Sequence, residues 1–447
     1  MTCSFVPPYL LEQIARSDAG VAPRAIATLS IDALLRAQRA TAPAPGPTPT
    51  TVAPGAAAVV PHWTVHTARN TTTLPGTPVR ENGDPASGDV AVDEAADGID
   101  GALRLFADVF DRSSYDGAGA DVSLTVHYGR DYDNAFWDGT QLVFGDGDGE
   151  IFDRFTKPVD VIGHELTHAV TEHSAGLRYQ DQPGALNESV SDVFGTCLKQ
   201  WLLGQDVDQA DWLIGAGLFL PGVQARGLRD MANPGSAYDD PRLGKDPQGA
   251  SMEEYVDTND DNGGVHLNSG IPNRAFHLAA TAIGGRSWEG AGAIWYTALT
   301  GGQVGATTDF AGFAAVTLAT AGEHAEAVRR AWETVGVTPV AGSASTTPTT
   351  EPGTVETLVH VRRTGGFAGR TVDGSLDLAS RDVRVPEVRT LVDRIDLSHV
   401  AGGNPHPDTF VYAFDLCGRR ARVPEQYLTP DLSRLATIVL GAGDPTS

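Results

Sequence analysis

The chain has 447 residues, of which 41% are hydrophobic and 20% charged; this is enough apolar material for two or three folded domains and excludes an intrinsically disordered protein. Its 32 basic and 57 acidic side chains give a net charge of −25, which opposes binding to a polyphosphate, so we expect no nucleic-acid partner. No apolar run approaches the roughly 20 residues of a bilayer-spanning helix, and the start of the chain lacks the pattern of an export signal. We therefore expect no membrane span, and the location stays open between the cytoplasm and export by an unconventional route.

Two segments rich in proline, serine and threonine, residues 41–58 and 341–354, cannot bury a core and are expected to be linkers. They divide the chain into a head (1–40), a body (59–340) and a tail (355–447). From residue 341 onward, 13 acidic and 11 basic residues give a net charge of −2, so the acidity belongs to the preceding three quarters of the chain. The only cysteines, Cys3, Cys197 and Cys417, are too few for a disulfide framework or a thiolate zinc site, so histidines and carboxylates must hold any metal.

The body changes its pattern at Pro158. Before it, alternating segments such as residues 122–128 and a glycine- and aspartate-rich turn at 145–149 predict strands and loops. After it, apolar residues recur at helical spacing, first at 161–170 and then at 186–203. We therefore predict an α+β fold with a strand-rich N-terminal half, a helical C-terminal half and the active cleft between them.

The first predicted helix of the body contains Gly163-His164-Glu165-Leu166-Thr167-His168, an H-E-x-x-H motif. A spacing of four places His164 and His168 one turn apart on the same helix face, where both imidazoles can bind one zinc ion. Glu165 then lies beside the open metal position and can take a proton from zinc-bound water. Such a motif also arises by chance on a solvated helix, so a third ligand has to decide between the two interpretations.

Asn187-Glu188-Ser189-Val190-Ser191-Asp192 follows on the second predicted helix. A catalytic zinc takes three protein ligands and leaves its fourth position to water, and Glu188 supplies the anionic ligand. Asp192 lies one turn later on the same face, where it can accept the second ring N–H of His164. The joint spacing disfavours the alternative of an exposed acidic helix.

These motifs resemble the thermolysin-like zinc metallopeptidases, and among them the protealysin subgroup with a short propeptide. The resemblance runs from about Asn70 to Val337. It rests on the H-E-x-x-H helix, the Asn187-Glu188 pair and three further segments: Asn134-Ala135-Phe136-Trp137-Asp138-Gly139, Gly145-Asp146-Gly147-Asp148-Gly149 and Gly263-Gly264-Val265-His266-Leu267-Asn268-Ser269-Gly270.

The resemblance implies that His164, His168 and Glu188 bind one zinc ion and that Glu165 is the general base. His266, oriented by Asp261, and Tyr179 would donate hydrogen bonds to the oxyanion of the tetrahedral intermediate.

It also implies that Asn134 and Ala135 pair with the substrate backbone and that Arg229 holds the carbonyl group after the scissile bond. Four apolar residues match the specificity pocket, which predicts cleavage on the N-terminal side of Leu, Phe or Ile: Phe152, Val161, Ile214 and Leu228.

One departure from the family concerns calcium. At the positions that match thermolysin's double calcium site only Asp160 and Asp211 remain acidic, while Lys199, Leu213 and Ala216 occupy the others. We expect the ammonium group of Lys199 to replace the metal between the two carboxylates. Calcium elsewhere, for example near Asp146 and Asp148, stays possible.

Near its start the head carries Pro7-Pro8-Tyr9-Leu10-Leu11, followed by a predicted helix through Arg39. This pattern resembles the short propeptide of protealysin-like precursors. Such a propeptide covers the catalytic cleft until it is cut away, and we expect the cut in the 41–58 linker.

The tail is predicted as a small α+β module with a helix over 385–397 and a strand-like run over 410–423. Through Arg363-Thr364-Gly365-Gly366-Phe367-Ala368-Gly369 it resembles emfourin, an inhibitor associated with protealysin-like enzymes. An accessory domain that binds substrate or a surface is the alternative.

Two other functions compete with that of a zinc endopeptidase acting on proteins or peptides. A non-catalytic binding or regulatory protein is disfavoured because no zinc ligand, base or oxyanion donor is substituted. A zinc amidase or exopeptidase is disfavoured by the extended backbone-binding positions, Asn134, Ala135 and Arg229, which suit the interior of a polypeptide.

Overall fold

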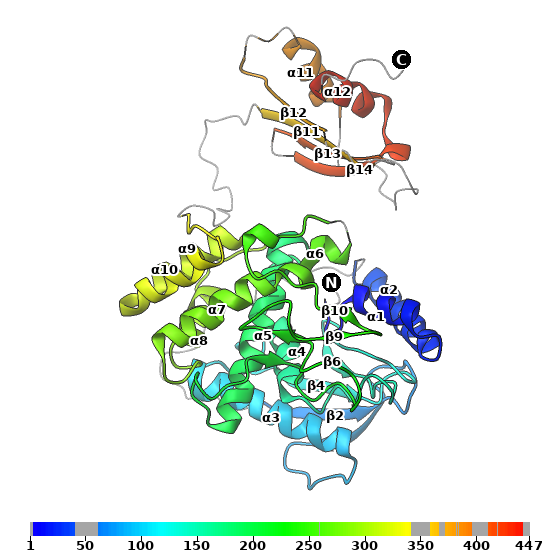
Figure 1. The fold of residues 1–447 in the computed structure, drawn as a ribbon, viewed down its shortest axis with the longest axis vertical. Helices are drawn as coiled ribbons and strands as arrows, with labels where there is room; N and C mark the ends of the chain where they lie inside the picture. Colours follow the sequence, from blue (N-terminus) through cyan, green and yellow to red (C-terminus); the bar gives the residue numbers. More distant parts are fainter. Residues whose placement is uncertain are drawn as a thin grey trace. The chain divides into compact units, whose positions relative to one another are not determined.

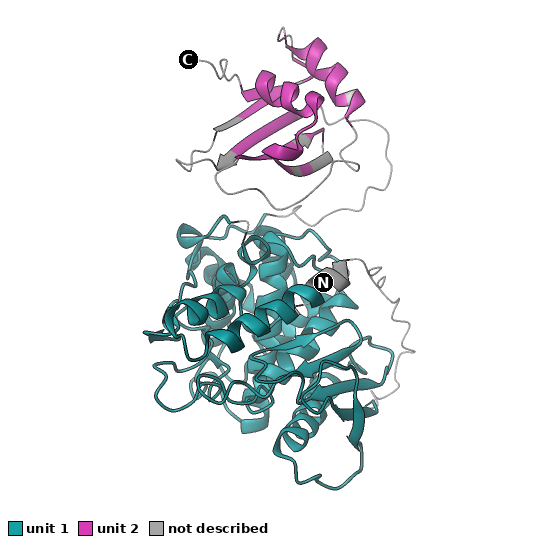
Figure 2. Ribbon diagram, turned by 90° about the vertical axis from the view of Figure 1, so that its right-hand side faces the viewer, with its two compact units in different colours: residues 1–346 teal, residues 347–447 magenta. Residues whose placement is uncertain are grey.

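The computed structural model describes residues 3–40, 61–258, 260–340, 358–365, 372–380, 382, 384–395, 410–417 and 419–440. The chain forms two compact units, residues 1–346 and 347–447 (Figure 2). The predicted α+β class is confirmed, with a strand-rich first half of the body and a helical second half. Both predicted linkers lie outside the described residues.

A six-stranded sheet in the order β1-β5-β6-β4-β2-β3 forms the strand-rich half. Figure 1 labels β2, β4 and β6 of this sheet. Strand β4 pairs in parallel with both β2 and β6, and the outer strands β3, β5 and β1 add antiparallel. The edge strand β1 belongs to the head, so the head completes the sheet. The strands are β1 (Cys3–Ser4), β2 (Trp63–Thr67), β3 (Thr77–Glu81), β4 (Val122–Val126), β5 (Ala135–Trp137) and β6 (Gln141–Phe144).

Helix α3 (Val90–Phe110) packs beside this sheet and against the first helix of the second half. It begins where the side chain of Asp89 accepts hydrogen bonds from the N–H groups of Ala91 and Val92, and it ends at Asp111 in the left-handed conformation. Its buried face carries small residues, so the neighbouring helix can approach closely. A methyl group on Gly98, for example, would lie 2.3 Å from Ile162.

Two packed helices, α4 (Val159–Glu172) and α5 (Asp181–Leu203), form the centre of the helical half. They can cross closely because glycines face each other. A Cβ on Gly195 would lie 2.6 Å from the Asp160 carbonyl oxygen, and one on Gly163 would lie 3.1 Å from the Cα of Gly195. Helix α5 starts five residues before the predicted apolar run because its first turn is polar and carries no apolar periodicity.

The remaining elements of the body surround this pair. Two short strand pairs come first: β7 (Leu213–Ile214) with β8 (Arg229–Asp230), and β9 (Asp239–Asp240) with β10 (Gly244–Lys245). Five α-helices and two short 3-10 helices follow in the described part of the body: η1 (Met252–Glu254), α6 (Asp261–Asn268), α7 (Gly270–Ile283), α8 (Ala291–Thr300), α9 (Phe310–Thr320), η2 (Gly322–His324) and α10 (Ala325–Thr334). None of the helices in the described ranges combines the length and hydropathy that a bilayer crossing needs.

The head contributes two helices, α1 (Pro8–Ser17) and α2 (Ala22–Ala40), where the sequence predicts one helical stretch. The residues between them, 18–21, contain Gly20 and form a turn. Leu10, Leu11 and Ile14 of α1 are buried in the same apolar core as the body. The head is therefore an integral part of the first unit.

In its described residues the tail has a four-stranded antiparallel sheet in the order β12-β11-β13-β14, two α-helices and one short 3-10 helix. Helix α11 ends at Arg394, three residues before the predicted end. The predicted strand-like run over 410–423 divides into two strands at a turn where Cys417 has a φ of 55°. The elements are β11 (Leu358–Gly365), β12 (Val372–Asp377), α11 (Val385–Arg394), β13 (Phe410–Leu416), β14 (Arg419–Pro424), η4 (Glu425–Tyr427) and α12 (Pro430–Leu440).

Candidate active site

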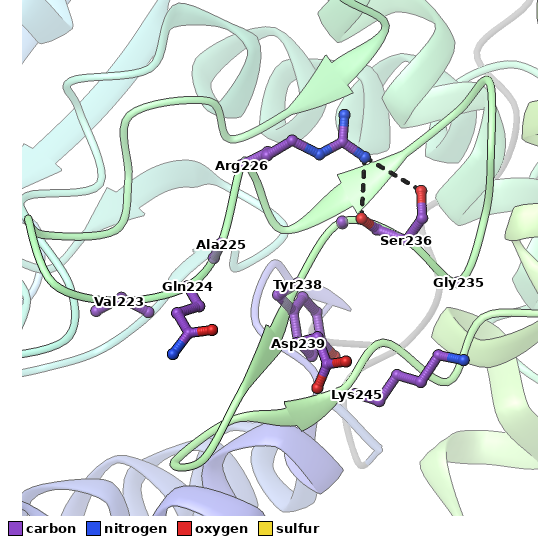
Figure 3. A pocket seen from close by; sticks show the side chains of 10 residues that line it. Val223, Gln224, Ala225, Arg226, Gly235, Ser236, Tyr238, Asp239 and Lys245 are labelled. Carbon is purple, nitrogen blue, oxygen red and sulfur yellow. Dashed lines mark hydrogen bonds between the residues drawn. The ribbon is translucent and has the colours of Figure 1, made fainter.

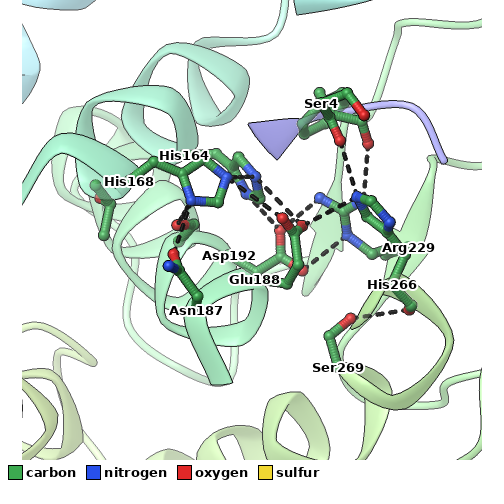
Figure 4. A network of polar contacts seen from close by, with 12 residues as sticks. Ser4, His164, His168, Asn187, Glu188, Asp192, Arg229, His266 and Ser269 are labelled. Carbon is green, nitrogen blue, oxygen red and sulfur yellow. Dashed lines mark hydrogen bonds and ion pairs between the residues drawn. The ribbon is translucent and has the colours of Figure 1, made fainter. Parts of the chain in front are cut away.

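The three predicted zinc ligands converge at the crossing of α4 and α5 (Figure 4). The Nε2 atoms of His164 and His168 lie 3.0 Å apart, and the Glu188 carboxylate lies 3.5 Å from the first and 3.4 Å from the second. Their ligand atoms all lie within 4.8 Å of one another, and all three side chains are buried. Oε2 of Glu188 has no hydrogen-bond partner among the described residues. A buried carboxylate oxygen without a partner beside two imidazoles fits a bound zinc ion.

Further contacts fix the orientation of both imidazoles. Nδ1 of His164 lies 2.9 Å from Asp192, as the sequence predicts, and Nδ1 of His168 lies 2.8 Å from the Asn187 amide oxygen. In each ring the Nδ1–H can donate to that oxygen, which leaves the Nε2 lone pair directed at the metal position. Burial and the neighbouring His164 lower the pKa of His168 to about 3, which keeps this imidazole in the neutral form that binds metal.

Glu165 is fully buried beside this cluster. Burial, followed by the negative charge of Glu188, raises the pKa of Glu165 well above its usual range. A carboxylate whose pKa is raised holds a proton more readily, which is the property that a general base and acid needs.

His266 approaches the cluster from α6. Its Nδ1 lies 2.6 Å from Asp261, and its Nε2 lies 3.2 Å from the hydroxyl oxygen of Tyr179. Burial opposes the protonation of His266, but Asp261 and Glu188 outweigh it and raise the pKa of His266 to about 9. The Tyr179 hydroxyl also donates to Glu188. Both predicted oxyanion donors therefore lie beside Glu188, next to the other zinc ligands.

The start of the head occupies the cleft in an extended conformation. Strand β1 pairs antiparallel with β5, and the Phe5 N–H donates to the Ala135 carbonyl oxygen at 3.0 Å. The Val6 N–H donates to Oδ1 of Asn134 at 2.8 Å. Arg229 donates to the Phe5 carbonyl oxygen at 3.2 Å, and Nε2 of His266 lies 2.8 Å from the Ser4 carbonyl oxygen. The three residues predicted to hold a peptide backbone therefore hold the backbone of the head.

The side chain of Phe5 is fully buried in an apolar pocket. Phe152, Val161, Ile214 and Leu228, which the sequence predicts to line a pocket, are also buried and belong to the same apolar cluster as Phe5. Sequence reasoning predicts His164 and Arg229 but misses Phe155 among the contacts of the Phe5 ring. Its centroid lies 5.2 Å from His164 and 6.4 Å from Phe155, and the guanidinium of Arg229 lies 4.8 Å from it.

Arg229 and Asp192 connect the pocket to the metal ligands. Nε and Nη2 of Arg229 donate to the two oxygens of Asp192 at 2.8 and 2.7 Å, and Asn273 donates to the same carboxylate at 2.8 Å. Burial alone would raise the pKa of Asp192, but Arg229 and His164 hold it well below its usual range. Asp192 therefore orients His164 and Arg229 together. Asn273, on α7, carries no sequence signal of this role.

Lys199 lies where the sequence predicts. Its ammonium nitrogen is 3.2 Å from Asp160 and 2.7 Å from Asp211, and it donates to the Leu213 carbonyl oxygen at 2.5 Å. Burial raises the pKa of Asp160, which is fully buried, while Lys199 opposes this shift.

A separate cavity of about 640 Å³ lies beside the β9–β10 hairpin (Figure 3). Arg226 on its wall donates to both oxygens of Ser236, and Tyr238 hydrogen-bonds Tyr9 of the head. None of its lining residues is a predicted site residue. The lining residues are Val223, Gln224, Ala225, Arg226, Gly235, Ser236, Ala237, Tyr238, Asp239 and Lys245.

The three converging ligands, the buried Glu165 beside them and strand β5, which binds the backbone of the head, together define a metallopeptidase site. Residues 59–172 match the family model of the thermolysin metallopeptidase catalytic domain, and residues 175–337 match that of its alpha-helical domain. The chain belongs to the thermolysin family of metallopeptidases and is a metalloendopeptidase.

Individual relatives agree with this assignment. The chain is 48% identical over 342 residues to an extracellular metalloprotease of Pectobacterium carotovorum subsp. carotovorum, covering 75% of this chain and 96% of that protein. It is 47% identical over 287 residues to protease PrtS of Photorhabdus sp., covering 62% of this chain and 76% of that protein. The solved precursor of protealysin from Serratia proteamaculans is similar, with a TM-score of 0.68, 48% identity, and coverage of 75% of this chain and 99% of that chain.

Proposed function

We propose that this protein is a zinc endopeptidase that cleaves on the N-terminal side of large hydrophobic residues, and that residues 1–40 are the propeptide of its precursor. The observation that carries the proposal is the position of the head. Phe5 fills the apolar pocket, and the preceding carbonyl oxygen, that of Ser4, accepts from His266 beside the three zinc ligands. A substrate bound in the same direction would place its scissile bond where the Ser4–Phe5 bond lies.

In this proposal His164, His168 and Glu188 hold the zinc ion, which, when bound, lowers the pKa of its water and polarises the substrate carbonyl group. Glu165 would take a proton from the attacking water and pass it to the leaving amine. His266 and Tyr179 donate hydrogen bonds to the developing oxyanion, with His266 held in place by Asp261. Asn134, Ala135 and Arg229 hold the substrate backbone on either side of the scissile bond.

The pocket occupied by Phe5 leads to an expected specificity. We compare three peptides that differ only in the residue after the scissile bond, which is Leu, Asp or Lys. The kcat/KM value for the Leu peptide should be roughly 10²-fold or more above the values for the other two, because a charged group loses its hydration in an apolar pocket. The comparison is made with enzyme freed of its head. Equal rates for the three peptides would refute the proposed specificity.

We also propose that the tail restrains the enzyme as a tethered inhibitor, which the resemblance of residues 363–369 to emfourin supports. A linker of about a dozen residues sets an effective concentration near the millimolar range, so even weak binding of the tail would occupy the cleft. A chain that ends at Val340 should hydrolyse a peptide several-fold faster than the chain with its tail, both without the head. Equal rates would favour an accessory domain.

We further propose that Lys199 replaces the double calcium site. Removing its charge by Lys199→Met should lower the free energy of unfolding by about 3–5 kcal/mol, because the buried carboxylate of Asp160 loses its partner. Lys157→Met is the matched control, since the ion pair of Lys157 with Asp153 is more exposed. Thermal unfolding measures both variants. A chelator that removes calcium but not zinc should leave the Tm of the wild type unchanged, and a large drop would contradict the proposal.

A further inference from the structure

Helix α2 of the head carries a polar stripe that faces the rim of the cleft. Its members, Arg24, Thr28 and Asp32, are spaced by four residues and therefore lie on one helix face. Thr28 and Asp32 are 1% and 3% exposed, although neither takes part in the extended segment that fills the cleft. The stripe is thus a second contact between the head and the body.

Each member of the stripe has a partner in the segment that leads into β5. Arg24 lies 2.7 Å from Glu150 and 3.5 Å from Asp131, and it donates to the Asp148 carbonyl oxygen at 3.3 Å. Further along the helix, Thr28 Oγ1 accepts from the Asp133 N–H at 3.1 Å. Arg24 and Thr28 therefore both contact the segment before β5, and Arg24 also contacts the turn at residues 148–150.

The third member, Asp32, joins two residues of the body. Its Oδ1 accepts from the Tyr132 hydroxyl at 2.5 Å, and its Oδ2 accepts from Nδ2 of Asn134 at 2.9 Å. The same Asn134 side chain binds Val6 through Oδ1 and Nδ2. One side chain of the body thus contacts both the extended segment of the head and α2.

These contacts are costly to separate. Separation exchanges the buried hydrogen bonds of Thr28 and Asp32 for bonds to water, at a net loss of about 0.5–1.5 kcal/mol for each bond. It also leaves the half-exposed carboxylates of Asp131 and Glu150 without Arg24. Among the described residues, Arg24 is the only basic side chain that lies within 4 Å of Asp131 or Glu150. Because β1 and α2 are joined through helix α1, they bind as two linked ligands, and each raises the effective concentration of the other.

We propose that the stripe of Arg24, Thr28 and Asp32 retains the head on the body after the linker has been cut, so that a single cut in the linker does not open the cleft. Residues 131–134 and Glu150 then form a docking surface for a helix with a basic, a hydroxyl and an acidic residue at spacings of four. After a cut in the linker of the wild-type chain, the cleft opens when α2 itself is cut or displaced. This inference rests on the proposed role of the head as a propeptide.

The test uses the full chain with Glu165→Gln, so that no self-digestion occurs, and with a site for an unrelated sequence-specific protease placed in the 41–58 linker. After the cut, size-exclusion chromatography at low micromolar concentration should show the head eluting with the rest of the chain. The same chain with Arg24→Ala and Asp32→Ala should release its head, with a dissociation constant at least about 10²-fold higher. Arg16→Ala is the control, because Arg16 pairs with Glu12 of its own helix on an exposed face.

A charge exchange checks that the effect comes from the contact and not from a damaged helix. Arg24→Glu alone and Glu150→Arg alone each bring like charges together and should weaken retention about tenfold, and the double variant should restore it. The inference is overturned if the unchanged head separates at once after the cut, or if Arg16→Ala releases the head as strongly as the stripe variant. It is also overturned if the double variant Arg24→Glu with Glu150→Arg does not restore retention of the head. Since these readouts need no turnover, they are independent of the proposed function, which fails separately if the wild-type chain freed of its head does not hydrolyse peptides.

Discussion

Replacing Glu165 by glutamine is expected to lower kcat/KM for peptide hydrolysis by roughly 10²- to 10⁴-fold while zinc remains bound. The amide keeps the shape of the side chain but cannot accept a proton, and Glu165 itself is not among the three converging metal ligands. Hydrolysis of a synthetic peptide and zinc content should be measured on the same preparation after the head has been removed.

The matched control for this variant is Glu289→Gln, because Glu289 lies on the surface and pairs with Arg286. It should keep wild-type turnover. If Glu165→Gln also kept turnover, another group would have to serve as the base, and the proposed mechanism would be wrong.

Replacing Phe5 by alanine is expected to make the uncut chain active. Phe5 is 0% exposed in the pocket, and truncating such a side chain costs about 3–5 kcal/mol. That cost corresponds to roughly 10²- to 4 × 10³-fold weaker occupancy of the cleft by the head. The initial rate of peptide hydrolysis by freshly purified chain that still carries its head measures the effect.

Leu34→Ala is the control for Phe5→Ala, because Leu34 lies on the same head but is 65% exposed. It should leave the chain as inactive as the wild type. An uncut wild-type chain that hydrolyses peptides as fast as Phe5→Ala would show that the head does not block the cleft.

Much of the site could be predicted because the motifs fix local geometry. A spacing of four in an α-helix places His164 and His168 together, and the second helix brings Glu188 to them, as the structure confirms. Asp192 lies one turn after Glu188 and reaches His164 in the same way. The ion pairs of Lys199 with Asp160 and Asp211 are instead predicted from the resemblance to the family's double calcium site. The predictions for the three zinc ligands and for Asp192 need only two helices and the contact between them.

The parts that sequence reasoning missed depend on long-range packing. Phe155 and Asn273 contact the site from a loop and from α7, where neither has a pattern of its own. The partners of α2 illustrate the same limit. Asp32 is one of many acidic residues in the sequence, and only the fold reveals that it is buried against Tyr132 and Asn134.

The zinc content of the purified chain tests the central claim most directly. Elemental analysis at limiting zinc should find about one zinc ion per chain in the wild type and in the surface control Glu289→Gln. It should find at least tenfold less zinc in Glu188→Gln. Wild-type chain without zinc, or Glu188→Gln with its full zinc content, would contradict a metal centre built from His164, His168 and Glu188.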